Sequence, residues 1–529
     1  MIIWILLLIA AVILLYKYGT RNFDYFQKKG LAFNKPHFLV GSRLSTVLGT
    51  KNMIEMLTEI YNEHRDEKIS GMFEFNRPAY FIRDPEMIKR LCIKEFDSFS
   101  DHRLILSKEA EPLFASALFG LTGQKWRDMR ATLSPAFTGS KMRLMFKLIN
   151  DVGSQMSNTV LEQINKGADN KIEFKEFAQK FTIDIIASCA FGLEINSFNN
   201  PNNDFLRIAR KATNFATFKT TIKLVGLLGA PWLMKIFKIK FLDEEFYKFF
   251  GAMMTDTIKT REEKKITRND MIDLILQAKH GKQLDYDNEE HTVDGFATVE
   301  ESQLGKEKVK RTWEDDELLA QCVGFFFGGF ETVSSVMTFM AAELIIDPNI
   351  QKKLQDEIDE VHKSLNGETL TYEHVQKMKY MDMVVCETLR KWPPAPIVDR
   401  KCTKEFNFEY DDKKFIMEYD KNFYVPIYSL HHDERYFPEP EKFDPERFND
   451  ENKKNIRQDC YIPFGIGPRN CIGNRFALLE VKTIFYYLLL NFTFEATNET
   501  EIPLKLGRSQ TTLQLENGLK CALIPRAEE

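Results

Sequence analysis

The sequence contains little cysteine, and its cysteines do not cluster. Eight cysteines are scattered over 529 residues, and no two form a C-x-x-C pair. This spacing argues against the common zinc sites and against a disulfide framework, and it indicates a reducing compartment. No histidine lies within thirty residues of Cys471, so a local Cys–His protease pair is excluded as well.

The chain also lacks a strong charge of either sign and a linker that would divide its body into several domains. The net charge is −5, which does not indicate a nucleic-acid partner. No stretch rich in proline and glycine divides the chain, and no internal repeat is visible. With 44% hydrophobic residues the chain can bury a large core. We therefore expect residues 41–529 to form one large catalytic domain.

The N-terminus lacks the features of a cleaved signal peptide. Residues 1–16 are apolar, with no charged start before them and no small-x-small cleavage site after them. Four cations follow, at Lys17, Arg21, Lys28 and Lys29. We expect residues 1–20 to form an uncleaved signal-anchor transmembrane helix and residues 21–40 to form a linker. The positive charge should keep the following domain on the cytosolic side.

The most informative stretch is residues 464–473, which read Phe-Gly-Ile-Gly-Pro-Arg-Asn-Cys-Ile-Gly. It precedes an apolar run, Phe476 to Leu490, that predicts a helix. A cysteine at a helix N-terminus faces unpaired N–H groups and the positive end of the dipole, which favour thiolate. Glycines allow a tight bend around the sulfur. A single thiolate held in this way suits haem iron, which takes one soft axial ligand. The alternative, from the cysteine alone, is a buried structural cysteine in a tight turn.

This stretch resembles the haem-binding signature of the cytochrome P450 family, Phe-x-x-Gly-x-Arg-x-Cys-x-Gly. It matches the signature at every defined position: Phe464, Gly467, Arg469, Cys471 and Gly473. The resemblance implies haem b, iron protoporphyrin IX, with Cys471 as the axial ligand. It also implies a mainly α structure with a small β-sheet region, the cytochrome P450 fold, behind an N-terminal transmembrane helix.

A long central helix is predicted from a capping box at residues 312–315 to Ile346, where Asp-Pro stops it. Two adjacent glycines, at 328 and 329, cost this helix about 2 kcal/mol relative to alanine. They make sense where something flat approaches the backbone. By resemblance, Thr332 hydrogen-bonds the activated oxygen and Glu331 helps to deliver protons. The alternative from the residues alone is a glycine kink with a back-bonding threonine.

Glu387 and Arg390 are neighbours on one helix face, and such a pair is ordinarily a surface ion pair of little energetic weight. The resemblance instead implies a buried Glu-x-x-Arg pair beneath the haem, joined by Arg447. The role of these three residues would be structural support of the cysteine loop.

Four side chains are expected at the haem propionates by resemblance: Trp126, Arg130, Arg400 and Arg469. Trp126 and Arg130 lie at i and i+4 on one helix face, and arginine suits forked pairing with a carboxylate. Arg103 is a further candidate, whereas the neighbouring His102 is expected to be structural.

Three other stretches carry predictions. Strand-like runs within residues 79–85 and 389–430 suit a small sheet. Residues 281–311 are polar and charged and predict a long mobile loop. In residues 224–241, lysines alternate with apolar and aromatic side chains, which favours insertion at a membrane interface over a core helix.

The resemblance covers nearly the whole chain, with the motifs in family order, and residues 123–137 resemble insect microsomal enzymes of the detoxification clan. It implies a haem-thiolate monooxygenase on the cytosolic face of the endoplasmic reticulum membrane. The enzyme would insert one atom of O2 into apolar small molecules, foremost xenobiotics such as plant toxins or insecticides. Alternatives are an endogenous lipid or hormone hydroxylase, a haem-thiolate peroxide isomerase, and a haem sensor or carrier without turnover.

The resemblance also implies electron partners: NADPH–cytochrome P450 reductase, with cytochrome b5 as a second donor. A basic surface is expected to receive the acidic reductase. It would comprise Lys125, Arg127, Lys141, Arg143 and Lys147. The alternative for these cations is a solvated helix face. An aromatic-lined pocket is expected near Phe325, Phe326, Phe327 and Phe330, with Phe114, Leu118 and Phe119 as further candidates.

Overall fold

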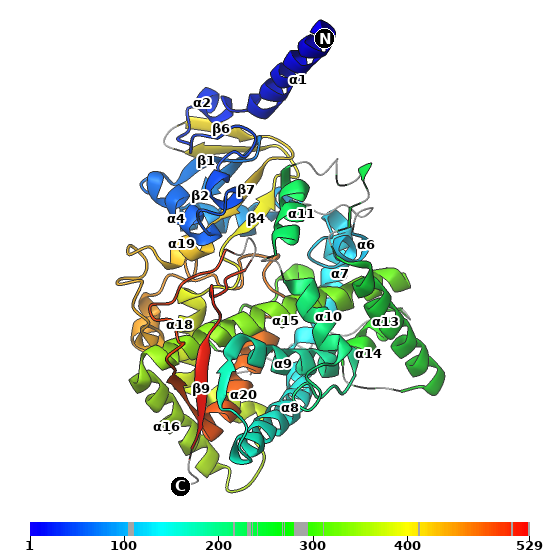
Figure 1. The fold of residues 1–529 in the computed structure, drawn as a ribbon, viewed down its shortest axis with the longest axis vertical. Helices are drawn as coiled ribbons and strands as arrows, with labels where there is room; N and C mark the ends of the chain where they lie inside the picture. Colours follow the sequence, from blue (N-terminus) through cyan, green and yellow to red (C-terminus); the bar gives the residue numbers. More distant parts are fainter. Residues whose placement is uncertain are drawn as a thin grey trace.

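The fold is mainly helical, with the largest sheet near the N-terminal helix and a separate three-stranded sheet towards the opposite end, near the C-terminus (Figure 1). The computed structural model describes residues 1–103, 111–214, 217–229, 234, 236–237, 239–240, 242–266, 268, 270–279, 295–309, 311–410, 413–508 and 512–526. The predicted mainly α fold with a small β-sheet region is confirmed.

The central helix α15 (Asp315–Ile346) crosses the middle of the body and organises the core (Figure 1). Its capping box uses Glu314 and Glu317, two residues later than predicted. It ends at Ile346, as Asp347–Pro348 predicts. The helix is apolar enough to cross a membrane, but 83% of its most apolar window is buried within the protein. It is therefore a core helix.

In the part of the chain that the structure describes, the α-helices other than α1 and α15 pack around α15 and the sheets. In chain order they are α2 (Tyr25–Lys29), α3 (Leu44–Val47), α4 (Met53–Glu63), α5 (Pro85–Lys89), α6 (Pro112–Ser116), α7 (Gly123–Leu133), α8 (Gly139–Asn165), α9 (Phe174–Ile186), α10 (Asp204–Thr213), α11 (Phe218–Gly229), α13 (Glu244–Lys264), α14 (Met271–Lys279), α16 (Pro348–Ser364), α17 (Tyr372–Lys377), α18 (Lys379–Lys391), α19 (Ile427–His431) and α20 (Asn474–Asn491). Both α9 and α20 contact α15 directly. α20 begins two residues before the predicted start.

Strands form within both predicted strand-like runs, whereas residues 69–74 and a separate three-stranded sheet were not predicted. The largest sheet has the order β1-β2-β7-β4, and it joins residues near 80 to residues near 400 and 424. β2 and β7 pair in parallel, and the other two pairs are antiparallel. The strands are β1 (Ile69–Glu74), β2 (Arg77–Ile82), β4 (Val398–Lys401), β7 (Asn422–Val425), the hairpin β5 (Phe406–Tyr410) with β6 (Lys413–Met417), and the sheet β3 (Lys171–Glu173), β9 (Lys520–Pro525), β8 (Phe492–Ala496).

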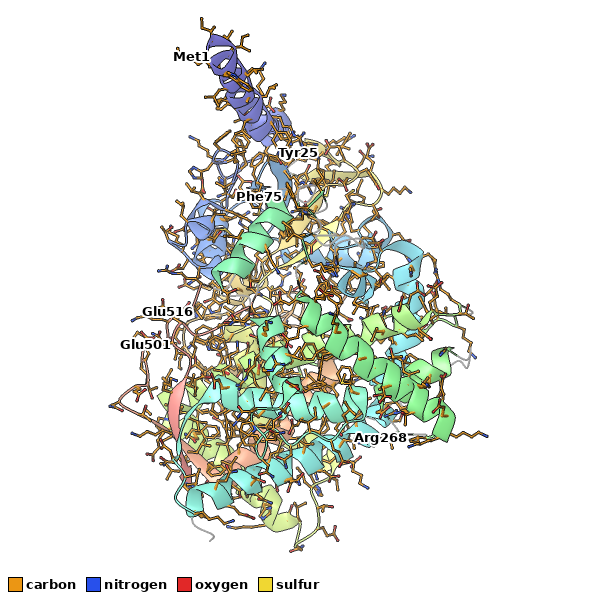
Figure 2. The ribbon with its side chains drawn as sticks, turned by 45° about the vertical axis from the view of Figure 1, so that its right-hand side comes forward. Met1, Tyr25, Phe75, Arg268, Glu501 and Glu516 are labelled. Carbon is orange, nitrogen blue, oxygen red and sulfur yellow. The ribbon has the colours of Figure 1, made fainter. Side chains whose placement is uncertain are left out.

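The N-terminal helix α1 (Ile2–Thr20) projects from the sheet end of the body, with Met1 at its tip (Figures 1 and 2). The helical stretch Ile2–Lys29 is long and apolar enough to cross a membrane, and only 6% of its most apolar part is buried. Such a long, exposed apolar helix is suited to a bilayer. Part of the predicted linker is packed, because Phe26 of α2 is fully buried against Phe73.

Two other predicted segments are described in part. In residues 224–241, Leu227 and Met234 are buried, whereas Ile236 and Phe237 are 64% and 68% exposed. Positions 230–233, 235, 238 and 241 lie outside the described residues. Positions 281–294 and 310 of the predicted mobile loop also lie outside. Residues 295–309 differ from that prediction, because they pack on the body and include a 3-10 turn at Gln303–Lys306.

Candidate active site

The loop that carries Cys471 is a tight turn held by its own backbone. The Asn470 N–H donates to the Gly467 carbonyl at 2.9 Å, and the Cys471 N–H donates to the Phe464 carbonyl at 2.8 Å. Gly467 has φ +75°, and an added Cβ would lie 2.1 Å from the Cys92 carbonyl oxygen. Only glycine fits there. Gly473 has φ −93°, and a Cβ there would meet its nearest neighbour at an ordinary 3.7 Å.

Cys471 is exposed, whereas the other seven cysteines are buried. Its thiol nevertheless lies deep in the protein, and this burial raises the pKa of the thiol. The Gly473 N–H and the charge of Arg130 lower the pKa, but burial has the larger effect. The prediction that the helix N-terminus lowers the pKa of Cys471 is therefore wrong for the protein without a bound metal. The helix starts at Asn474, so the sulfur sits ahead of the N-cap and is desolvated. A deep but accessible sulfur faces an interior space, where a metal ion would stabilise the thiolate.

Two buried arginines near this loop have a donor with no protein partner among the described residues. Arg469 donates to the carbonyls of Ser100 and Leu121, and Arg400 donates to those of Asp399 and Ile466. The Arg469 Nη1 and the Arg400 Nε remain unsatisfied.

Burial lowers the pKa of Arg469 to about 9. Its Nη2 already pairs with Asp101 at 3.3 Å, but the spare Nη1 of this buried cation still calls for an acceptor, and an anion would suit it. The Arg469 guanidinium also lies over Trp126, 4.0 Å from the ring centroid. These groups fit a haem propionate.

Two adjacent glycines of α15 have different surroundings. A Cβ on Gly329 would lie 3.0 Å from Ile186 Cδ1, so this glycine lets α9 approach. A Cβ on Gly328 would meet nothing within 4 Å, and Gly328 is exposed although its helix is a core helix. Gly328 therefore faces open space inside the fold, which fits the close approach of a flat group.

Comparison with known proteins identifies the family. The sequence model described as Cytochrome P450 matches residues 32–521. The chain belongs to the cytochrome P450 family. This cytochrome P450 is 40% identical to cytochrome P450 9e2 of Blattella germanica, over 100% of this chain and 98% of the relative. Identity is 36% to cytochrome P450 9b2 of Drosophila melanogaster, over 97% of each chain. It is 35% to cytochrome P450 6k1 of Blattella germanica, over 98% and 96%.

These matches confirm the resemblance to insect enzymes and make the protein a cytochrome P450 monooxygenase, an oxidoreductase. Family membership implies a haem-thiolate cofactor and a reductase partner.

The two side chains predicted for oxygen activation both have partners within the protein. The Thr332 hydroxyl donates to the Gly328 carbonyl, the back-bonding geometry of the alternative reading. Its oxygen keeps lone pairs that can accept a further hydrogen bond. Glu331 is 4% exposed, forms an ion pair with Lys175 and accepts a hydrogen bond from Gln514 at 3.1 Å.

The three residues predicted to support the cysteine loop meet in the core of this cytochrome P450. Glu387 accepts from Arg390 Nε at 2.7 Å and Nη2 at 2.9 Å, and from Arg447 at 3.4 Å. Arg390 also donates to the His431 carbonyl, and the His431 ring accepts the Ile462 N–H. Hydrogen bonds thus run from Glu387 to the start of the cysteine loop.

Arg130 differs from the other predicted propionate ligands because its guanidinium is occupied by protein. It donates to the Asn470 carbonyl at 2.8 Å and to the Asn470 side chain at 2.7 Å. Its remaining donors reach both oxygens of Glu301. Sequence reasoning missed Glu301, since a glutamate in a polar stretch carries no signal of its own. Arg103, the further candidate, pairs with Glu74.

The predicted basic surface for the reductase contains neutralised charges. Lys125 pairs with Glu317, Arg127 with Asp97 and Arg143 with Glu373. Three of the five predicted cations are therefore paired with acidic side chains.

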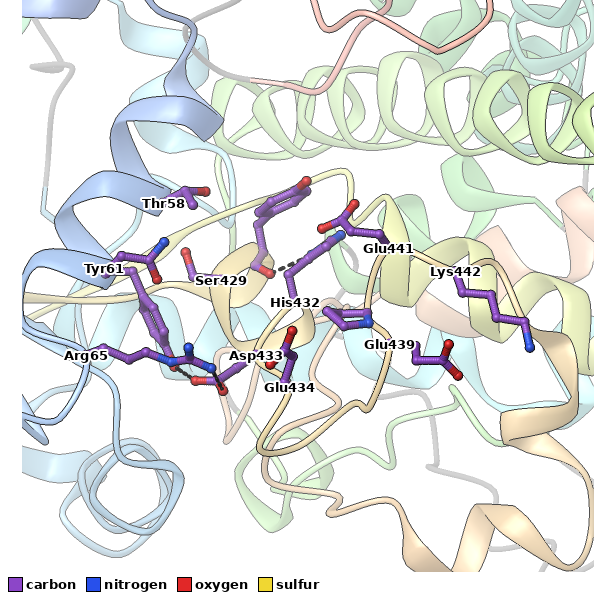
Figure 3. Close-up of a pocket in the computed structure, with 13 residues that line it drawn as sticks. Thr58, Tyr61, Arg65, Ser429, His432, Asp433, Glu434, Glu439, Glu441 and Lys442 are labelled. Atoms are coloured by element: carbon purple, nitrogen blue, oxygen red, sulfur yellow. Dashed lines mark hydrogen bonds and ion pairs between the residues drawn. The ribbon is translucent and has the colours of Figure 1, made fainter.

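A separate cavity of about 560 Å³ lies between α4 on one side and α19 with the segment that follows it on the other (Figure 3). Its lining residues are Thr58, Tyr61, Asn62, Arg65, Tyr428, Ser429, His432, Asp433, Glu434, Glu439, Pro440, Glu441 and Lys442. They include none of the predicted site residues, and most are polar or charged. This cavity is not the site of the monooxygenase chemistry.

Proposed function

We propose that this cytochrome P450 oxidises apolar xenobiotics, such as plant toxins or insecticides. It would insert one atom of O2, with electrons from NADPH through a reductase and with cytochrome b5 as a second donor. The observation that carries this proposal is the exposed Cys471 in its hydrogen-bonded loop, close to two buried arginines with a donor that has no acceptor among the described residues.

The side chains around the cysteine loop would have different roles in binding the haem. Cys471 would bind the iron, and Trp126, Arg400 and Arg469 would hold the propionates. Arg130 would hold the cysteine loop in addition to any propionate contact. The haem, when bound, supplies the oxygen-activating chemistry. Thr332 would offer its hydroxyl for hydrogen bonding, and Glu331, in contact with Lys175, would exchange protons at its carboxylate.

An apolar substrate is supported by the aromatic side chains near Gly328. Phe327 of α15 is partly exposed and lies 5.6 Å from the ring of Phe114, which is 6.2 Å from that of Phe119. Phe326 and Phe330 are fully buried in the core and do not line a pocket. Partly exposed aromatic side chains inside a fold favour apolar ligands and fix few polar groups. An endogenous lipid or hormone has the same character and is the second candidate.

We also propose that the protein is anchored in a membrane. Residues 1–20 would be a single-pass anchor, residues 21–40 a linker and residues 41–529 the catalytic domain. The domain would lie on the cytosolic face of the endoplasmic reticulum. The exposed apolar helix α1 supports this arrangement.

The deciding experiment uses membranes that contain the full chain, its reductase and NADPH. Plant toxins and insecticides are compared with fatty acids and terpenoid hormones for binding spectra and for hydroxylated product. Products from the first group alone are expected. Turnover confined to endogenous lipids would overturn the xenobiotic assignment. Hydroperoxide conversion without NADPH would indicate an isomerase, and haem without NADPH consumption would indicate a sensor or carrier.

The metal ligand is tested separately. The reduced, CO-bound protein should absorb near the position typical of thiolate-ligated haem, and Cys471→Ala should lose this absorbance. A retained spectrum in Cys471→Ala would require another ligand.

A further inference from the structure

Residues 295–302 form a strap that runs across the base of α18 and α20 to the cysteine loop. At its start, the Phe296 N–H donates to Asp382 Oδ2 at 3.1 Å. Asp382 is paired at 2.7 Å with Lys482 of α20, whose side chain is only 1% exposed. The Phe296 ring packs 5.5 Å from that of Tyr461. The strap is therefore fastened to buried groups of the core.

The middle of the strap is hydrogen-bonded to the residues on both sides of the cysteine. Asn474 accepts the Val299 N–H at 3.1 Å and donates to the carbonyls of Val299, at 3.2 Å, and Cys471, at 2.9 Å. Asn470 donates to the Glu300 carbonyl at 3.3 Å. The strap and the cysteine loop thus share their polar side chains.

The strap ends on an ion pair that is nearly closed to solvent. Glu301 accepts from Arg130 Nε at 3.0 Å and Nη2 at 2.7 Å, and the two side chains are 9% and 3% exposed. Ser134 adds a hydrogen bond to the same carboxylate at 2.9 Å. The opposite edge of the Arg130 guanidinium holds the carbonyl and the side chain of Asn470.

We propose that Glu301 is a positioning residue for the cysteine ligand and acts through Arg130; this inference rests on the proposed role of Cys471. A forked ion pair fixes the plane of the guanidinium, and that plane holds the peptide group that precedes Cys471. Without the carboxylate, Arg130 becomes a buried cation with spare donors and can turn away from Asn470. The sulfur would then be less firmly held.

The test uses the full-length, haem-loaded protein with Glu301→Gln, and Glu300→Gln as the matched control. Glu300 is exposed, so its substitution makes the same change of charge one residue away. The readout is hydrogen exchange at the Asn470 and Cys471 amides, which are hydrogen-bonded within the loop. In Glu301→Gln these amides should exchange about tenfold faster, with no change in Glu300→Gln. The thiolate-type CO spectrum of Glu301→Gln should also decay faster on standing.

A double variant tests the route through Arg130. In an Arg130→Gln background, Glu301→Gln should cause no further increase in exchange, because the partner that transmits the effect is gone. If Glu301→Gln does not accumulate as folded protein, Glu301→Asp keeps the charge on a shorter side chain and should give an intermediate rate.

The inference is overturned by an exchange rate equal to that of the parent in Glu301→Gln or Glu301→Asp. It is also overturned by an undiminished effect in the Arg130→Gln background. Failure of the proposed function is distinguishable, because it would appear as an unchanged CO spectrum in Cys471→Ala.

Discussion

At the scale of single residues, two signature glycines of the cysteine loop have different constraints. Gly467 combines a left-handed backbone with a Cβ position 2.1 Å from the Cys92 carbonyl oxygen, whereas Gly473 has neither constraint. We expect Gly467→Ala to destabilise the protein by about 2 kcal/mol or more, through strain and displacement of the loop. Gly473→Ala should cost far less. Thermal unfolding and haem content measure both, and equal losses would show that the haem, rather than the backbone, sets the requirement at 473.

The hydroxyl of Thr332 lies beside the exposed Gly328 and is expected to take part in proton delivery. Thr332→Ala removes the hydroxyl and leaves the open space at Gly328, so haem content and substrate binding should persist. We expect more hydrogen peroxide and less product per NADPH, because a hydrogen-bonding group is lost where protons must be delivered. Thr332→Ser keeps a hydroxyl and serves as the control. Tight coupling in Thr332→Ala would transfer this role to another donor.

At the scale of elements, the end of α19 is tied to α18 and to the cysteine loop through one neutral histidine. The His431 Nδ1 bonds the Arg390 carbonyl at 3.0 Å, and its Nε2 accepts the Ile462 N–H at 3.1 Å. Burial, reinforced by the charge of Arg390, lowers the pKa of His431 to about 3. A histidine with a lowered folded pKa contributes stability that is present above the unfolded pKa and is lost as pH falls towards the folded value.

This linkage predicts acid sensitivity below about pH 6.5. His431 should contribute a loss of about 1.4 kcal/mol of unfolding free energy per pH unit. His431→Gln should be less stable at pH 7.5 and should lose less further stability between pH 6.5 and 5. His37→Gln, at an exposed histidine, should retain the parental slope. Denaturant midpoints across this range provide the measurement, and identical slopes in the parent and in His431→Gln would contradict the assignment.

At the scale of the whole molecule, membrane contact is expected at two places. Deletion of residues 1–20 should release part of the protein from membranes and leave a weaker attachment. The exposed Ile236 and Phe237 offer the second contact. Insertion of such apolar side chains into the headgroup region removes them from water and lowers the free energy. Vesicle flotation of the truncated protein measures this attachment.

Aspartate at both Ile236 and Phe237 should abolish the residual flotation of the truncated protein. The control is Ile266→Asp at an exposed isoleucine, close in sequence to Arg268, which lies far from Met1 (Figure 2). If the truncated protein does not float at all, residues 224–241 do not bind membranes and the core-helix alternative is favoured.

Features that depend on local chemistry could be predicted from the sequence. The cysteine motif identified the family, Asp347–Pro348 placed the end of α15, and the apolar run placed α20 to within two residues. The i, i+3 spacing placed Glu387 beside Arg390. Each of these features depends on residues a few positions apart, whose geometry the backbone sets.

The partners of the charged side chains around the cysteine loop could be seen only in the folded structure. Packing leaves Arg400 and Arg469 with spare donors but turns Arg130 towards Asn470, although all three were predicted in the same role. Burial raises the pKa of Cys471, which the helix-terminus argument predicted to fall. The role of Glu301 follows only from the packing of residues 295–302 against α7, which brings Glu301 to Arg130. Desolvation and ion pairing depend on which segments meet in space, and no local spacing encodes that meeting.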